Sequence, residues 1–225
     1  PHVRLFAVRQ LAAIGNPACR KMLLELLEHE RDATVREAAA QAAEDLSPLR
    51  RLMGWWRFDE AGGGMAKDRT GHGNNGKVLG CKTVEGRIGR ALEFDGKSYV
   101  ELGRPANLPM ADREFTVAAW VKAAADEGVV VARGGAFCGF SLYLKEGRPC
   151  FGIRRQQNRP AYIARADQQV AGRWVHLAGV VRTDRIELFV DGRLAASTNI
   201  PGLLLSDCGQ GGWRSGSMPA TARPS

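Results

Sequence analysis

Alternation of apolar and polar residues in four segments constrains the fold of this chain more than any other feature. A period of two is typical of half-buried β-strands, because successive side chains of a strand point to opposite faces of a sheet. Turn residues close three of the segments, which favours antiparallel neighbours. The bulk of the chain is therefore predicted to be an antiparallel β-sandwich. The segments are Gly54–Glu60, Gly89–Gly96, Phe115–Lys122 and Gly172–Ser197.

Two tryptophans in these segments, Trp120 and Trp174, lie among small or β-branched residues. A large aromatic side chain beside small ones suits the space between two packed sheets. We therefore expect both indole rings to fill the core. His176 alternates with Trp174 and Ala178, so the three share one face of their strand. A lone histidine in such a place is more often a structural hydrogen-bonding residue than a catalyst.

Length and composition set the class of protein. A chain of 225 residues can form a substantial core or two unequal domains. Its content of 44% hydrophobic and 25% charged residues is typical of soluble globular proteins. The sequence contains no apolar run near the roughly 18 residues that cross a bilayer. Pro1 lies inside a helical pattern, so we expect that the natural N-terminus, and any export signal, is missing.

The formal net charge of +8 raises the hypothesis of a nucleic-acid partner. The basic residues are spread along the whole chain, and no basic cluster interleaves with aromatic residues. We therefore favour a solvated basic surface and expect no nucleic-acid partner.

The five cysteines have irregular spacing. It matches neither a zinc ribbon nor a C-x-x-C pair, so a metal or dithiol redox site is not expected. Two of them flank a predicted hairpin over Phe140–Lys145 and Arg148–Arg154, on opposite faces, and cannot easily bridge across it. A Cys138–Cys208 disulfide is possible and would imply an oxidising compartment. The cysteines are Cys19, Cys81, Cys138, Cys150 and Cys208.

Residues 1–48 have a helical pattern, in which apolar residues recur at three- and four-residue steps. We expect helices over 3–15 and 17–29, and a third that begins at the N-cap Asp32 and ends near Leu46. Gly15-Asn16-Pro17 separates the first two, because proline cannot continue a helix interior.

The first and third helical segments are alike, because Val3-Arg4 recurs as Val35-Arg36, 32 positions later. This pattern resembles HEAT-like helical repeats and covers about one and a half of them. Such repeats bury their apolar faces only by stacking, so we expect further repeats before Pro1. The alternative is an ordinary helical hairpin packed on the sandwich.

Residues 49–210 carry several motifs in an order that resembles the laminin G-like branch of the concanavalin A-like lectin/glucanase sandwiches. The resemblance implies a jelly-roll β-sandwich. The segments that carry it are an opening strand with Trp55, Trp56 and Phe58, the D-x-x-G-x-G-N-x-G loop (68–76), A-L-x-F-D-G (91–96), F-T-V-x-x-W-V (115–121), W-x-H-L-A (174–178) and L-x-V-D-G (188–192).

Catalytic residues are not expected in this chain. Glucanases of the superfamily place their paired carboxylates as E-x-D-x-E, because period two brings them to one face of a strand. The sequence has no such segment. It also has no serine or cysteine nucleophile near His176 with a third orienting group.

A calcium ion is a candidate ligand of the glycine-rich loop. Asp59, Asp68 and Asn74 are oxygen donors around it, and related domains carry calcium near the rim of the sandwich. The competing interpretation is that Asp and Asn are ordinary turn residues. We expect no other cofactor.

A second candidate site follows the predicted hairpin. Arg154, Arg155, Arg159 and Tyr162 are close in sequence and could bind an acidic glycan. Solvated surface charge is the competing interpretation.

Residues 211–225 lack alternation and contain two prolines, so we expect an irregular tail and a sandwich that is incomplete at its C-terminus. A reading-frame shift in the gene would explain this tail, and a natural disordered tail is the alternative.

The resemblance implies a non-catalytic, lectin-like recognition module that binds a glycan or a surface protein. It also implies an extracellular or periplasmic location in a larger exported bacterial protein, with further domains upstream on the same polypeptide. One alternative is an accessory fragment of a hydrolase, such as a sulfatase, whose catalytic domain lies upstream. No C-x-P-x-R sulfatase motif occurs here. Another alternative is a structural adhesion protein.

Overall fold

The computed structural model describes residues 2–14, 17–47, 52–60, 64–108, 110–134, 138–156, 159–204 and 212–216. The chain divides into two compact units, Pro1–Trp55 and Trp56–Ser225. The first is helical and the second consists of antiparallel β-strands. The predicted mainly β class with a small helical segment is confirmed.

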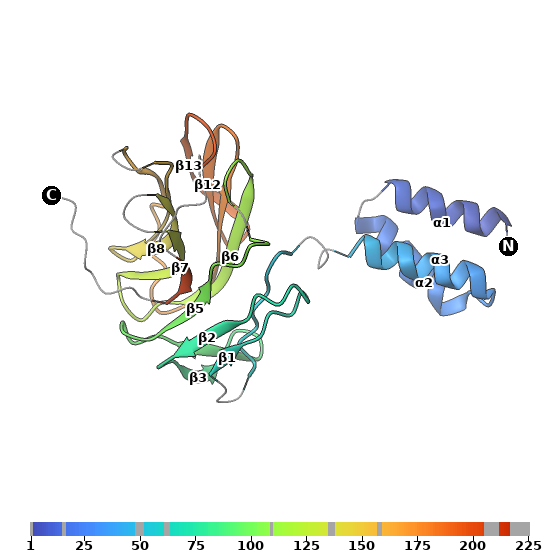
Figure 1. Cartoon of the computed structure of the whole chain (residues 1–225), viewed down its shortest axis with the longest axis horizontal. Coiled ribbons are helices and arrows are strands. Elements are labelled where there is room, and N and C mark those ends of the chain that lie inside the picture. Colours follow the sequence, from blue (N-terminus) through green and yellow to red (C-terminus); the bar gives the residue numbers. More distant parts are fainter. Residues whose placement is uncertain are drawn as a thin grey trace. The chain divides into compact units, whose positions relative to one another are not determined.

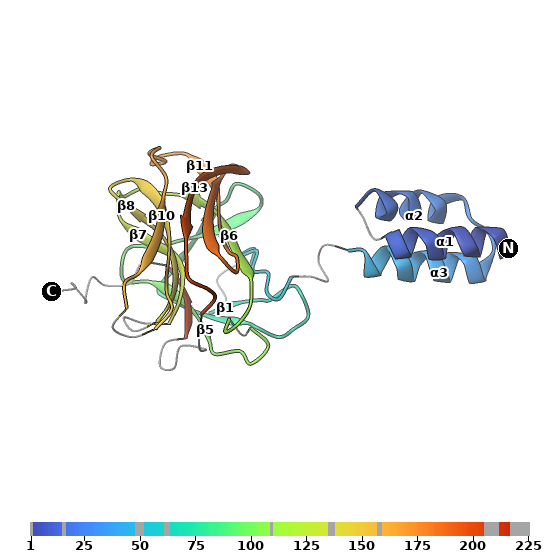
Figure 2. The same cartoon turned by 90° about the horizontal axis from the view of Figure 1, so that it is seen from above.

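Three helices form the N-terminal unit: α1 (His2–Ile14), α2 (Pro17–His29) and α3 (Ala33–Asp45). Asp32 is the N-cap of α3, and its carboxylate accepts a hydrogen bond of 3.1 Å from the backbone N–H of Val35. Helix α3 contacts both α1 and α2, as Figures 1 and 2 show. Leu23 and Val35 are fully buried between the helices, whereas Val3 and Phe6 on α1 are exposed. Part of the apolar surface of the repeat is thus uncovered in the described residues.

Two sheets and a separate hairpin form the second unit (Figures 1 and 2). The strands are β1 (Met65–Ala66), β2 (Gly76–Leu79), β3 (Lys82–Glu85), β4 (Arg90–Glu93), β5 (Tyr99–Gly103), β6 (Phe115–Lys122), β7 (Gly128–Gly134), β8 (Gly139–Lys145), β9 (Arg148–Arg154), β10 (Tyr162–Arg165), β11 (Trp174–Val181), β12 (Arg185–Val190), β13 (Arg193–Asn199) and β14 (Trp213–Ser215). The larger sheet has the order β1-β2-β5-β14-β7-β8-β9-β10 and the smaller β13-β12-β11-β6, while β3 pairs with β4.

Two-residue turns close the hairpins as expected. Both Glu146 and Gly147, between β8 and β9, have positive φ angles of 54° and 71°. The same holds for Asp191 and Gly192, between β12 and β13, at 50° and 78°. Turns of this kind match the twist of the strands that they connect. Asp95-Gly96 is an Asp-Gly pair of the kind that also predicts a hairpin, but it closes none, because β4 and β5 lie in different sheets.

The predicted opening strand over Gly54–Glu60 is not formed. Trp56 makes only an isolated bridge with Asp68, and its indole N–H donates a 2.7 Å hydrogen bond to the carbonyl of Asn74. Phe58 has a φ of 60°, in the left-handed region, which interrupts an extended segment. Alternation in such a short segment did not suffice to specify a strand.

The core between the sheets consists mainly of aliphatic and phenylalanine side chains, together with the buried Trp213. On β11, Val175 and Leu177 point inward and are fully buried; Phe151 of the larger sheet is also fully buried. Trp120 has an exposed fraction of 45%, and Trp174 is half-buried on the opposite face of its strand from the core residues. The prediction that both indole rings fill the core was therefore wrong.

The last described strand, β14, contradicts the expectation that no strand follows Gln210. It pairs with β5 on one side and β7 on the other, so it lies inside the larger sheet. Trp213 of β14 is buried and packs edge-on against Phe140, with ring centroids 5.1 Å apart. The reading-frame hypothesis stays a prediction, because 205–211 and 217–225 lie outside the described residues.

Candidate functional site

The outward side of the smaller sheet carries an aromatic surface, which we call the outer face. The antiparallel register places Trp120 opposite His176, and Ala178 between Ala118 and Phe189. Directly opposed residues of a sheet share one face. The outer face thus combines exposed rings with small side chains. It consists of Ala118, Trp120, Trp174, His176, Ala178, Phe189 and Leu194.

Trp120 is the most accessible aromatic ring of the outer face. Its centroid lies 5.3 Å from that of His176 in an edge-on arrangement. The guanidinium carbon of Arg87, from the loop between β3 and β4, lies 5.6 Å from the centroid of the same indole. A cation over a tryptophan face is electrostatically attracted to it. An exposed ring is thereby flanked by two polar groups.

Asp191 fixes the strand end beside this ring. Its carboxylate accepts hydrogen bonds from the backbone N–H of His176 at 2.9 Å and from the guanidinium of Arg173 at 3.0 Å. The bond from the His176 N–H, followed by that from Arg173, lowers the pKa of Asp191. The aspartate is therefore a structural anion at neutral pH.

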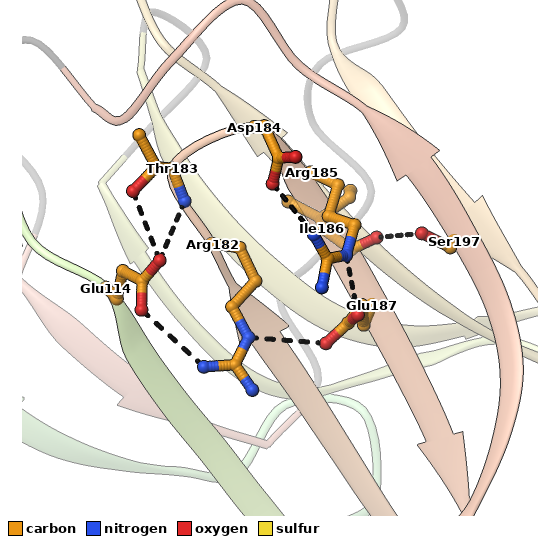
Figure 3. Close-up of polar contacts among 8 residues, drawn as sticks. All are labelled: Glu114, Arg182, Thr183, Asp184, Arg185, Ile186, Glu187 and Ser197. Atoms are coloured by element: carbon orange, nitrogen blue, oxygen red, sulfur yellow. Dashed lines mark hydrogen bonds and ion pairs between the residues drawn. The ribbon is translucent and has the colours of Figure 1, made fainter.

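A network of charged side chains lies at the other end of the same sheet. Figure 3 shows Arg182 between two carboxylates, with 3.5 Å to Glu114 and 3.4 Å to Glu187. Arg185 donates a 2.7 Å hydrogen bond to Glu187, which is the main reason why the pKa of Glu187 is lowered. The backbone N–H of Thr183 is the main cause that lowers the pKa of Glu114.

These carboxylates are poorly suited to glycoside hydrolysis. A general acid needs a raised pKa, so that it holds a proton near neutral pH. In the described part of the chain, every carboxyl group whose pKa is shifted has it lowered. None of these shifted carboxyl groups therefore has the raised pKa that a general acid requires.

The arginine candidates converge on a cavity, which we call the arginine pocket. Three of the four predicted residues line it, namely Arg155, Arg159 and Tyr162, while Arg154 is not among its lining residues. The cavity volume is about 230 Å³, and Gln156 and Pro201 complete the lining. The sequence could place the first three together because they follow one hairpin, whereas the proline comes from a distant segment.

The calcium candidates are engaged in local hydrogen bonds. Both carboxylate oxygens of Asp68 accept bonds within the loop, including one of 3.0 Å from the N–H of Asn74. Asp59 accepts from the N–H of Arg90 at 3.0 Å and pairs with Arg57 at 2.8 Å. Across the described ranges, no three His, Cys, Asp or Glu side chains gather as they would around a metal. Calcium binding stays a prediction.

The cysteines offer no activated thiolate among the residues with a shifted pKa. Burial raises the pKa of both Cys81 and Cys150, which keeps these thiols protonated near neutral pH. Cys138 is disulfide-bonded. Its predicted partner, Cys208, lies outside the described residues, so this pairing stays a prediction.

Sequence reasoning placed Trp120 on the wrong side of its strand and did not single out Arg87. One signal could have corrected the first error. Trp120 alternates with Thr116 and Lys122, whereas the other face of the strand carries only apolar residues, among them Val117. The mixed face is the one that a sandwich turns outward. Nothing local in the sequence marks Arg87, which reaches the indole from a separate hairpin.

Comparisons with known proteins agree with the geometry. A family model described as the concanavalin A-like lectin/glucanases superfamily matches residues 94–223, and a HEAT-repeat model matches residues 1–50. A search of curated proteins found no match. All helices in the described part of the chain are too short or too polar to cross a bilayer.

Several solved structures resemble this chain in fold. Domain 4 of AbnA, an extracellular arabinanase from Geobacillus stearothermophilus in complex with arabinotriose, has a TM-score of 0.54 at 19% identity, covering 66% of this chain and 76% of that one. The receptor binding domain of botulinum neurotoxin D has a TM-score of 0.53 at 15% identity, and the match covers 70% of this chain and 43% of that one. A structure of botulinum neurotoxin type C, described as dependent on two ganglioside molecules to enter cells, has a TM-score of 0.54 at 11% identity. The match covers 70% of this chain and 42% of that one. The chain spans less than half of each neurotoxin structure.

Proposed function

This chain belongs to the concanavalin A-like lectin/glucanases superfamily, and from that premise we propose that its sandwich is a non-catalytic module that binds a carbohydrate on the outer face. The observation that carries the proposal is the position of Trp120, 45% exposed, between His176 and Arg87. Trp120 does not stand alone, because the exposed Leu194 and the half-buried ring of Phe189 lie on the same face, and a contiguous exposed apolar surface marks a binding site.

The chemistry of the outer face suits a sugar ring. The C–H faces of a sugar are apolar and can cover an indole, which removes apolar surface from water. The hydroxyl groups at the rim of the sugar need hydrogen-bond partners, which Arg87 and His176 can supply. Ala118 and Ala178 beside the ring are short, so a flat ligand can lie on the strands. The fold relatives named with arabinotriose or gangliosides support this ligand class by analogy.

The surroundings of the module are part of the same proposal. The HEAT-repeat match over residues 1–50 supports a polypeptide with further helical repeats. We place the module in an extracellular or periplasmic protein, as the recognition part of a larger bacterial polypeptide. Such a module could belong to a hydrolase, for example a sulfatase whose catalytic domain lies upstream. It could equally belong to a structural adhesion protein.

A glycan array with the purified chain tests the proposal. We expect binding to a restricted set of glycans, and Trp120→Ala to weaken it at least tenfold through loss of the ring contact. The matched control is Ile163→Ala, because Ile163 is also 45% exposed but lies on β10 of the larger sheet. The control should bind like the natural chain.

Two results would overturn the proposal. One is equal binding by the natural chain and the Trp120 variant. The other is the absence of binding to every glycan on the array, which would move the function to a protein partner.

A further inference from the structure

We propose that the arginine pocket is a second ligand site, which binds the sulfate or carboxylate group of an acidic sugar. Anion binding at this pocket does not depend on the outer face. Only the identification of the anion's carrier as a sugar rests on the proposed function.

The charge of the pocket is not balanced from within the described chain. Arg155 and Arg159 both line it, and among the described residues neither forms an ion pair with a carboxylate. Other arginines of the sandwich do have such partners: Arg165 pairs with Glu146 at 2.6 Å, and Arg173 with Asp191 at 3.0 Å. Two guanidinium groups on one cavity repel each other and attract an anion.

Arg155 is held in place for this role. Its Nε donates a 2.8 Å hydrogen bond to the carbonyl of Leu203. This bond anchors the guanidinium group and does not use its two terminal nitrogens, which can donate to a ligand. Gly202 lies beside it, where a β-carbon would come within 3.0 Å of a terminal nitrogen of Arg155. The glycine thus leaves space for the guanidinium group. A planar, anchored guanidinium is suited to bidentate recognition of carboxylate or sulfate oxygens.

The remaining lining adds neutral hydrogen-bond donors. Tyr162 is half-buried, with its ring packed against the core, and its hydroxyl group can donate to an oxyanion. Gln156 also lines the pocket, and its side-chain amide N–H can likewise donate a hydrogen bond to an oxyanion. The volume of about 230 Å³ lies below the roughly 300–1,000 Å³ of pockets for drug-sized ligands. It suits one charged substituent or one sugar unit.

The pocket is separate from the outer face. Pro201 follows the end of β13, where Asn199 pairs with Arg185. Tyr162 begins β10, which lies beside this end because the Ile163 carbonyl accepts a 2.8 Å hydrogen bond from the hydroxyl of Thr198. Trp120 lies toward the opposite end of that sheet, opposite His176. The two sites can therefore be tested independently.

Binding of sodium sulfate and sodium glucuronate to the full chain tests the proposal, with glucose as the neutral control. Titration calorimetry or NMR is run at constant ionic strength, because salt screens exposed charges. We expect both anions to bind and glucose not to bind at this pocket. Arg159→Gln should weaken anion binding about tenfold, and Arg155→Gln at least as much.

Three variants make the outcome decisive. Arg193→Gln removes the same charge from the exposed start of β13 and should leave anion binding unchanged. Trp120→Ala should also leave it unchanged, which separates the two sites. Because Arg155→Gln also removes the bond to Leu203, Tyr162→Phe provides a milder second change, expected to weaken binding severalfold. Equal anion binding by Arg159→Gln and the natural chain, or no anion binding at all, would overturn the proposal.

Discussion

The two faces of the smaller sheet are built from alternate residues of the same strands, yet they have opposite characters. On the inner face, Val175 and Leu177 are fully buried against the larger sheet. On the outer face, Trp120 keeps 45% of its surface in solvent and contacts His176. The side chains of the inner face fill the core and stabilise the fold, whereas those of the outer face include rings and polar groups that a ligand can reach. A one-residue step along a strand thus separates a folding role from the proposed binding role.

The largest effect should come from emptying the inner face. Leu177→Ala removes a fully buried side chain, and we expect it to lower the free energy of unfolding by about 2–5 kcal/mol. His176→Ala, one position away on the outer face, should cost less than about 1 kcal/mol. Urea unfolding followed by tryptophan fluorescence measures both. Equal losses would show that the two faces do not differ as described.

Overfilling the inner face should have the next largest effect. A β-carbon on Gly179 would collide with the ring of Phe151, so Gly179→Ala should cost about 1–3 kcal/mol. Ala178→Ser on the outer face should change stability by less than about 0.5 kcal/mol. The same unfolding measurement applies. A neutral Gly179→Ala variant would mean that the two sheets can move apart at this point.

The smallest effect concerns the charged network at the other end of the smaller sheet. The pKa of Glu187 is held below its ordinary value of 4.5, first by the hydrogen bond from Arg185. Its contribution to stability is therefore present above pH 4.5 and is lost as the pH falls through the lowered pKa of the folded chain. Glu187→Gln should lower stability at pH 7 by about 1 kcal/mol, since the arginines are partly exposed.

Thermal unfolding at pH 7 and pH 3 checks this behaviour. The difference between the natural chain and Glu187→Gln should shrink at the lower pH. A difference that stays constant across this range would assign the effect to packing rather than to charge.

Local signals in the sequence predicted local structure well. The N-cap Asp32 correctly marked the start of α3, and Glu146-Gly147 marked the hairpin between β8 and β9. The helix bounds followed from the same kind of signal, because capping and turn residues act on their immediate neighbours. The arginine pocket was partly visible for the same reason, since Arg155, Arg159 and Tyr162 are close in sequence.

Features that depend on distant contacts were not accessible in this way. Alternation correctly predicted the strand that contains Trp120. The indole ring was assigned to the wrong face, because both faces of that strand contain apolar residues. Arg87 reaches the indole from another hairpin. Strand β14 is short, and its register with Gly103 and Arg133 is set by partners far away along the chain. Long-range pairing of this kind leaves little trace in local composition.

The position of β14 has a consequence for how the sandwich is assembled on the ribosome. Strands β5 and β7 are synthesised first and flank a gap in the larger sheet, which Trp213–Ser215 fills. Until those residues emerge, both strands present unpaired backbone groups, as edge strands do. Closure of the larger sheet therefore waits until these residues have been translated, and chaperones that shield strand edges would act on the nascent chain during that interval.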